Sequence, residues 1–130
     1  MKLNFAILCD NAFTDKEGRL NVIQKFERIY TDRLPTTYPR VTVVTNFFIN
    51  EEERDKEYIQ TLEIKKDGSS DIILTTNQIS VTPIGDVDYI NYINYINALT
   101  FDSDGVYKIF IKINGGVVGE TSLLVKKNDI

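Results

Sequence analysis

The residues that could do chemistry in this 130-residue chain are few, because it contains no histidine and a single cysteine, Cys9. Histidine is the most frequent general base and transition-metal ligand near neutral pH. Catalysis would therefore depend on carboxylates, lysine, tyrosine or the Cys9 thiol. No glycine-rich phosphate loop, Cys/His metal spacing or nucleophile elbow occurs. We expect a protein that is not an enzyme, with a carboxylate-based enzyme as a remote alternative.

Cys9 is the one strong nucleophile, and its place in an alternating apolar segment favours a structural role. It shares the parity of Leu3, Phe5 and Ile7, so we expect a small buried hydrophobic residue. A reactive thiol would need exposure and a nearby base or cation.

Asp102 and Asp104 are the weak candidates for a metal site. With Gly105 they resemble the start of a calcium loop, but no bidentate glutamate follows, because the sequence runs directly into an apolar strand from Tyr107. We expect an ordinary turn here, and no metal or cofactor requirement.

The most unusual feature is a Tyr-Ile-Asn triplet that occurs three times in succession between Tyr89 and Asn97. A period of three fits neither a strand nor a helix, so in a strand it places tyrosine and isoleucine on both faces. Neither face is polar enough to be left in water, and tyrosine is enriched at protein interfaces. We predict a protein-contact surface, with an extension covered by its own chain as the alternative. The candidate interface residues are Tyr89, Tyr92, Ile93, Tyr95 and Ile96.

Composition excludes several classes of partner. The net charge of -4 opposes nucleic-acid binding, which depends on lysine and arginine to neutralise phosphates. We expect no membrane span and no signal peptide, because an aspartate soon interrupts the short apolar start of the chain. With one cysteine and no internal disulfide, we expect a reduced, cytoplasmic setting.

The elements that would position these residues are β-strands. Leu3 to Tyr30 reads as a long hairpin around the turn Asp15 to Gly18. Later strands follow, and the turn before Tyr107 is typical of the corner where a tyrosine hydroxyl ties down an immunoglobulin-like sandwich. Parity predicts one core shared by the first and last hairpins, made of Phe5, Ile7, Leu20, Val22, Phe26, Tyr107, Ile109 and Ile111.

These patterns predict an all-β fold. We expect an antiparallel β-sandwich, immunoglobulin-like or Greek-key, with about seven to nine strands. Residues 1–130 should form a single domain, with residues 126–130 as a disordered tail.

The opening of the chain also resembles a known family. The matching segments are FAILCD from Phe5, GRLNVI from Gly18, FERIY from Phe26, Leu34-Pro35, and YPR from Tyr38. The family consists of small bacterial proteins catalogued as a domain of unknown function. The resemblance implies a β-sandwich, and it supplies no activity and no functional residues. One departure is Gln24, where a small residue such as glycine is expected.

The function that these observations favour is a non-catalytic protein-interaction or assembly module, whose partner is another protein or a second copy of the chain. A β-sandwich that binds a small ligand or a cation is the alternative.

Overall fold

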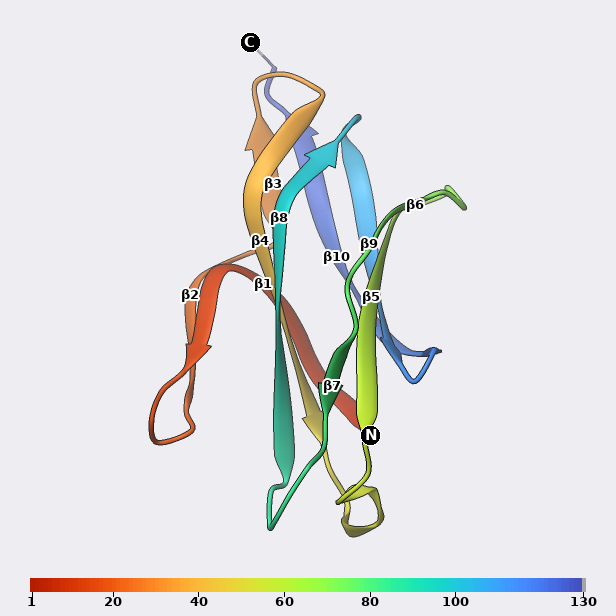
Figure 1. Ribbon diagram of the computed structural model, residues 1–130. Helices are drawn as coiled ribbons and strands as arrows, with labels where there is room; N and C mark the ends of the chain where they lie inside the picture. The colour runs from red at the N-terminus through yellow and green to blue at the C-terminus, as the bar shows by residue number, and fades with distance from the viewer. Residues whose placement is uncertain (130) are drawn as a thin grey trace.

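The computed structural model describes residues 1–129, and β-strands dominate it (Figure 1). The elements in chain order are β1 (Lys2–Thr14), β2 (Leu20–Phe26), β3 (Arg28–Thr31), β4 (Thr36–Phe48), the short 3-10 helix η1 (Glu51–Glu53), β5 (Tyr58–Lys66), β6 (Ile72–Thr75), β7 (Ile79–Val81), β8 (Tyr89–Phe101), β9 (Gly105–Ile113) and β10 (Gly116–Lys127).

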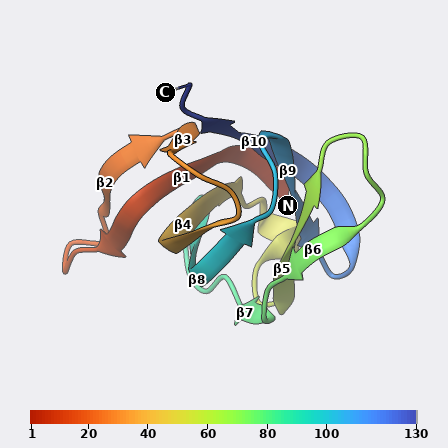
Figure 2. The same ribbon diagram turned by 90° about the horizontal axis from the view of Figure 1, so that it is seen from above.

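The strands form two sheets that face each other (Figure 2). The first sheet has the order β2-β1-β4-β8; the second has the order β3-β10-β9-β5-β6, and β7 also pairs with β5. This architecture confirms the predicted β-sandwich. Two details differ from expectation: there are ten strands, and β3 pairs with β10 in parallel. Both follow from the chain crossing to the second sheet at Glu27, which makes β3 a strand separate from β2.

The main core fills the space between the sheets. Tyr107, Ile109 and Ile111 of β9 are buried there, as predicted. The Tyr107 hydroxyl donates a 2.6 Å hydrogen bond to the Ser103 carbonyl oxygen, which ties down the turn before β9. Other strands of the second sheet add Ile29, Leu62, Ile64, Leu123 and Val125. The first sheet contributes further large apolar side chains, among them Leu8, Val41, Val43, Phe47, Ile96, Leu99 and Phe101.

The predicted inward face of β1 is wrong beyond Leu3. An irregularity in the pairing of β1 with β4, between Leu3 and Phe5, shifts the register. A bulge of this kind reverses which side chains face the core. Leu8 therefore enters the main core, whereas Phe5 and Ile7 pack in a second, smaller cluster with Cys9.

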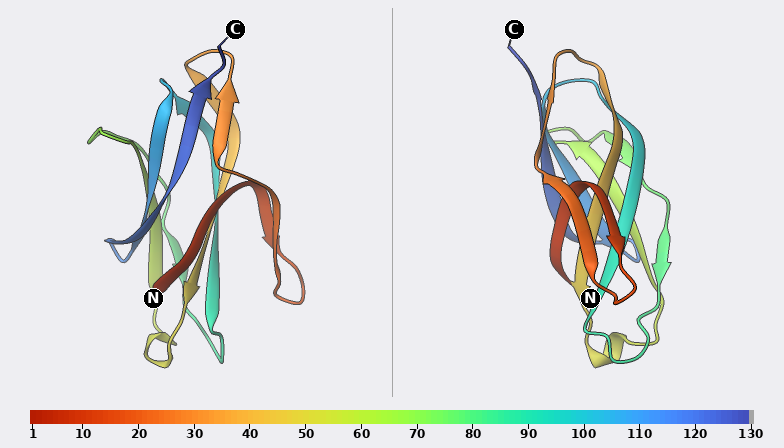
Figure 3. Two further views of the ribbon diagram at one scale, coloured as in Figure 1. Left: turned by 180° about the vertical axis from the view of Figure 1, so that it is seen from behind. Right: turned by 90° about the vertical axis from the view of Figure 1, so that its left-hand side faces the viewer.

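The hairpin of β1 and β2 explains why both faces of β1 are apolar. It arches away from the sandwich and turns down beside the first sheet (Figure 3). Leu20 packs on the second cluster, while Val22 is 37% exposed and Phe26 packs half-buried against the main core. The prediction that these three residues join one core is therefore wrong for Leu20 and Val22.

The C-terminal segment is more ordered than expected. Lys126 and Lys127 belong to β10 and pair with Tyr30 and Thr31 of β3. The backbone amide of Asn128 then donates to the Thr31 carbonyl oxygen at 2.8 Å. The predicted disordered tail is wrong for these residues, and Ile130 lies outside the described residues.

Candidate functional site

Strand β8, which contains the Tyr-Ile-Asn repeat, is the last strand of the first sheet. It pairs with β4 on one side, and within residues 1–129 no strand pairs with its other edge. Its thirteen residues include no charged side chain. Such an edge presents backbone N–H and C=O groups that can pair with another chain, and natural proteins usually guard it with lysine or proline.

The even-numbered residues of the repeat point into the sandwich. Tyr92 is 1% exposed, and its hydroxyl donates to the Tyr58 carbonyl oxygen at 3.2 Å. Burial, together with the nearby Tyr58, raises the pKa of Tyr92 to about 12. Ile96 lies in the same core. The prediction that Tyr92 and Ile96 supply a contact surface is therefore wrong, because their side chains are internal.

The odd-numbered residues face outward, and the β1–β2 hairpin covers them in part. Ile93 is half-buried beneath it, packed on the second cluster. The Tyr95 hydroxyl donates to the Ala12 carbonyl oxygen at 2.7 Å. Tyr89 and Tyr95 nevertheless remain 51% and 48% exposed. The alternative of a strand covered by its own chain thus holds for Ile93 and leaves the two tyrosines accessible.

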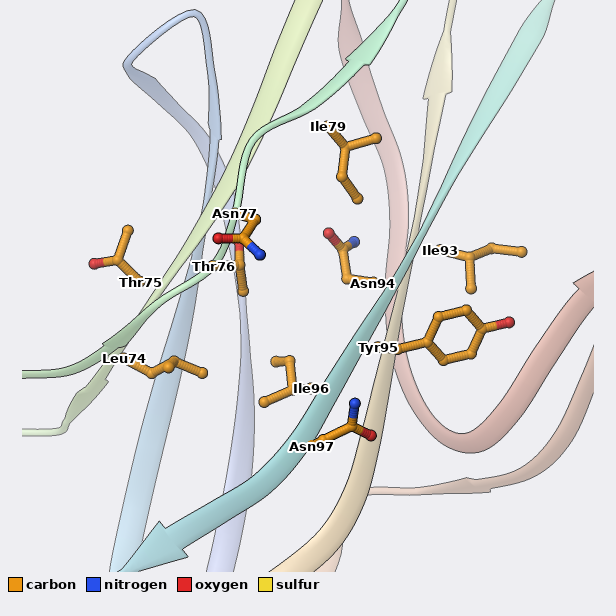
Figure 4. A pocket seen from close by; sticks show the side chains of 10 residues that line it. All are labelled: Leu74, Thr75, Thr76, Asn77, Ile79, Ile93, Asn94, Tyr95, Ile96 and Asn97. Carbon is orange, nitrogen blue, oxygen red and sulfur yellow. The ribbon is translucent and has the colours of Figure 1, made fainter.

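A pocket of about 420 Å³ lies beside β8, where the sandwich opens between the two sheets (Figure 4). Leu74, Ile79 and Ile96 project into it, while Ile93 and Tyr95 point away on the far side of β8. None of the lining residues is charged; they are Leu74, Thr75, Thr76, Asn77, Ile79, Ile93, Asn94, Tyr95, Ile96 and Asn97. The pocket therefore offers amide and hydroxyl groups around apolar side chains.

Sequence reasoning missed the contribution of the segment Leu74 to Ile79 to this pocket. The available signal is that residues 72–81 carry no charge, although 26% of the chain is charged. An uncharged stretch beside an uncharged edge strand indicates a surface without charged side chains.

A buried hydrogen-bond chain fixes β8 at the back of the pocket. The Asn94 amide nitrogen donates to the Val43 carbonyl oxygen at 3.1 Å, and its oxygen accepts from Gln60 Nε2 at 3.1 Å. The Thr45 hydroxyl donates to the oxygen of Gln60. Buried polar groups that are satisfied in this way hold the strands in one register. The edge is therefore presented on a rigid support.

The regular edge of β8 ends where the repeat ends. Ala98 has a φ of 57°, in the left-handed region, and like Pro39 of β4 it has no partner in the β4–β8 ladder. Proline has no N–H to donate to the ladder, so the pairing is interrupted at this point. The uninterrupted edge thus coincides with Tyr89 to Asn97.

The other candidate residues do not assemble into a reactive site. Asp102 and Asp104 are exposed in the turn before β9. Asp102 shares a pocket with Lys66, whose ammonium donates to the Ser103 hydroxyl at 2.6 Å. Among residues 1–129, no group of three or more His, Cys, Asp or Glu side chains could hold a metal ion.

Cys9 is fully buried, as predicted for a structural residue. Burial and the negative charge of Asp10 raise the pKa of its thiol, although a backbone hydrogen bond at Asn11 opposes this. The thiol lies 3.7 Å from the Thr42 carbonyl oxygen, to which it donates. A high pKa and complete burial both disfavour nucleophilic chemistry.

Comparisons with known proteins place the chain in a family without supplying an activity. Within residues 1–129, no helix is long and apolar enough to cross a membrane. No curated protein matches the chain. The model of a family of unknown function, DUF6941, matches residues 4–126, which agrees with the resemblance of the opening segments. The chain therefore belongs to the family of unknown function DUF6941.

Proposed function

We propose that this protein is a non-catalytic protein-interaction module and that its contact surface is the free edge of β8. The observation that carries the proposal is the unpaired edge of the Tyr-Ile-Asn repeat, which lacks the charged residues that normally guard such a strand. Exposed Tyr89 and Tyr95 flank this edge.

The mode of binding would be addition of an extended strand to the first sheet. In this mode main-chain hydrogen bonds provide affinity, and pockets for alternate side chains provide specificity. The pocket between β8 and the segment Leu74 to Ile79 lies where an inward side chain of an added strand would point. Its uncharged lining favours apolar or amide side chains over charged ones, since burying an unpaired charge is costly.

Two features support binding of a protein over binding of a cation or catalysis. The pocket has no carboxylate to coordinate a cation. The Cys9 thiol, the strongest nucleophile, is buried away from it. The compartment that we propose is the bacterial cytoplasm, where a single thiol stays reduced.

Selection from a phage-displayed library of random dodecapeptides tests this proposal. We expect the enriched peptides to be extended, uncharged sequences that alternate apolar and polar residues. The variant Asn77→Lys places a charge on the pocket, and it should weaken binding of the selected peptides by at least about tenfold.

The matched control is Ser122→Lys, which adds the same charge on the exposed outer face of the second sheet. It should bind the peptides like the unmodified protein. Peptides that bind all three proteins equally, or a library that yields no binder, would contradict the proposal.

A further inference from the structure

We infer that the strand which occupies the free edge of β8 is β8 of a second copy of this chain, paired antiparallel with Ile93 opposite Ile93. The inference rests on the proposed function, because it names the occupant of the same edge. It makes the repeat a device for self-recognition.

The repeat is complementary to itself when it is reversed. Read backwards, Tyr-Ile-Asn becomes Asn-Ile-Tyr, so an antiparallel pair centred on Ile93 places isoleucine opposite isoleucine in all three triplets. In the same register every tyrosine lies opposite an asparagine. Directly opposed side chains on one face of an antiparallel pair interact, and matched apolar pairs stabilise it. No other segment of the chain has this property over nine residues.

The register centred on Ile93 is favoured over the alternatives. It opposes odd-numbered residues to odd-numbered residues, so the inward faces of both copies lie on the same side of one continuous sheet. A slip of three residues would oppose an inward to an outward side chain. A slip of six would keep the faces but would pair only one triplet from each copy.

Charge and strand geometry agree with a second copy as the occupant. Each chain carries a net charge of -4, so two copies repel each other, and a contact surface without carboxylates avoids further repulsion at close range. Both β8 and residues 72–81 beside it are uncharged. The left-handed Ala98 ends the regular edge where the self-complementary segment ends. The regular free edge of β8 and the self-complementary repeat therefore cover the same residues.

The outward tyrosines find partners in this arrangement. Tyr89 lies opposite Asn97 of the second copy, and Tyr95 lies opposite its Asn91. Both Tyr89 and Asn97 are exposed in the single chain, so substitutions there can test the register without disturbing the core.

Sedimentation equilibrium over a range of concentrations provides the test. We expect the unmodified protein to dimerise reversibly. The variant Tyr89→Glu/Asn97→Glu would oppose two carboxylates at each end of the pair, and it should be monomeric. The variant Tyr89→Lys/Asn97→Glu would oppose a lysine to a glutamate at both ends, and it should dimerise again. Both variants lose the same Tyr89 contact with Phe48, so each controls for the other.

The possible failures are distinct. An unmodified protein that stays monomeric at every concentration overturns this inference, while peptides that still select the β8 pocket would preserve the proposed function. A dimer that Tyr89→Glu/Asn97→Glu does not weaken shows that the contact lies elsewhere and overturns this inference, while the peptide selection still decides the proposed function. Equal loss of the dimer in both variants shows that Tyr89 does not face Asn97, and it overturns the register.

Discussion

Gln24 and Ala98 adopt positive φ angles of 52° and 57° although each carries a β-carbon. This conformation costs an L-residue about 1–2 kcal/mol, and glycine avoids most of that cost. Gln24 is exposed and lies in β2 where the family resemblance leads one to expect glycine. The departure of the sequence therefore leaves strain in the hairpin that covers the first sheet.

Replacing Gln24 with glycine should consequently stabilise the protein. We expect the free energy of unfolding to rise by about 0.5–1 kcal/mol, since part of the relief is offset by the greater freedom of glycine in the unfolded chain. Urea denaturation measures the change. Gln24→Ala keeps the β-carbon and serves as the control, for which no gain is expected. A loss of stability in the glycine variant would show that the left-handed conformation is not strained.

We expect the Cys9 thiol to be unreactive in the native protein. Its side chain is fully buried and the pKa of its thiol is raised, chiefly by that burial. Because the thiolate is the reactive form, a disulfide reagent such as DTNB should label Cys9 only as fast as the protein opens. We expect labelling to be complete at once in denaturant and slow without it. Equally fast labelling in native buffer would refute the buried placement.

At the scale of elements, the bulge in β1 can be tested by comparing two apolar residues of the opening hairpin. Leu8 is buried between the sheets, so Leu8→Ala should destabilise the protein by about 2–5 kcal/mol. Val22 is 37% exposed, so Val22→Ala should change stability by no more than about 0.5 kcal/mol. Denaturant unfolding of both variants decides the matter. The reverse order of effects would mean that the register shift between Leu3 and Phe5 is absent.

The outer face of the second sheet contains an ion cluster that should make stability depend on pH. Lys112 and Lys65 lie 2.7 Å and 3.2 Å from the two carboxylate oxygens of Glu63. Hydrogen bonds from Lys112 and then Lys65 lower the pKa of Glu63 below its ordinary value of 4.5. A depressed native pKa means that the unfolded chain takes up the proton first as the solution is acidified. The stabilisation is therefore complete above about pH 4.5 and is lost as the pH falls through the native pKa.

Glu63→Gln should flatten this part of the profile. We expect urea melts of the variant to lose less stability between neutral pH and pH 3 than melts of the unmodified protein. Asp15 and Glu27 also have lowered pKa values, but both proteins retain them, so their contribution cancels in the comparison. Parallel profiles would contradict a stabilising role for the native Glu63 carboxylate.

Alternation and turn chemistry were sufficient to predict most strands. The Asp15 carboxylate accepts hydrogen bonds from the backbone amides of Glu17 and Arg19, and Gly18 has the positive φ that the turn requires. Apolar alternation gave the wrong inward face for β1 for two reasons. It does not reveal a bulge, and Phe5 and Ile7 are apolar because they pack beneath the covering hairpin. The ordering of Lys126 was missed for a similar reason, since pairing with β3 is a long-range contact.

The same limit applies to the candidate site. The repeat pointed to β8, but only the fold shows which of its faces is internal, so Tyr92 and Ile96 could not be separated from Tyr89 and Tyr95 beforehand. The pocket could not be predicted from the repeat alone, because its other wall comes from Leu74 to Ile79 of the opposite sheet. Local sequence patterns do not show which distant segments the sandwich places side by side.

At the scale of the whole molecule, one side of the sandwich is closed and the other is open. On the closed side the chain crosses from β2 of the first sheet to β3 of the second sheet. On this side too, Leu3 of β1 lies so close to Gly119 of β10 that a β-carbon on Gly119 would overlap the Leu3 side chain. On the open side β8 faces residues 74–79 across the pocket, with no strand of residues 1–129 on its outer edge. This asymmetry directs association to one edge of the molecule.

Amide hydrogen exchange of Tyr89 to Asn97, compared in dilute and concentrated solution, tests the pairing of β8 with a second copy most directly. Alternate residues of a strand direct their N–H groups to the same edge, and pairing protects those groups from exchange. We predict that every second amide of the repeat exchanges more slowly in the concentrated sample, while the amides of β9 and β10 are unchanged. Exchange along β8 that is identical at both concentrations would contradict the claim.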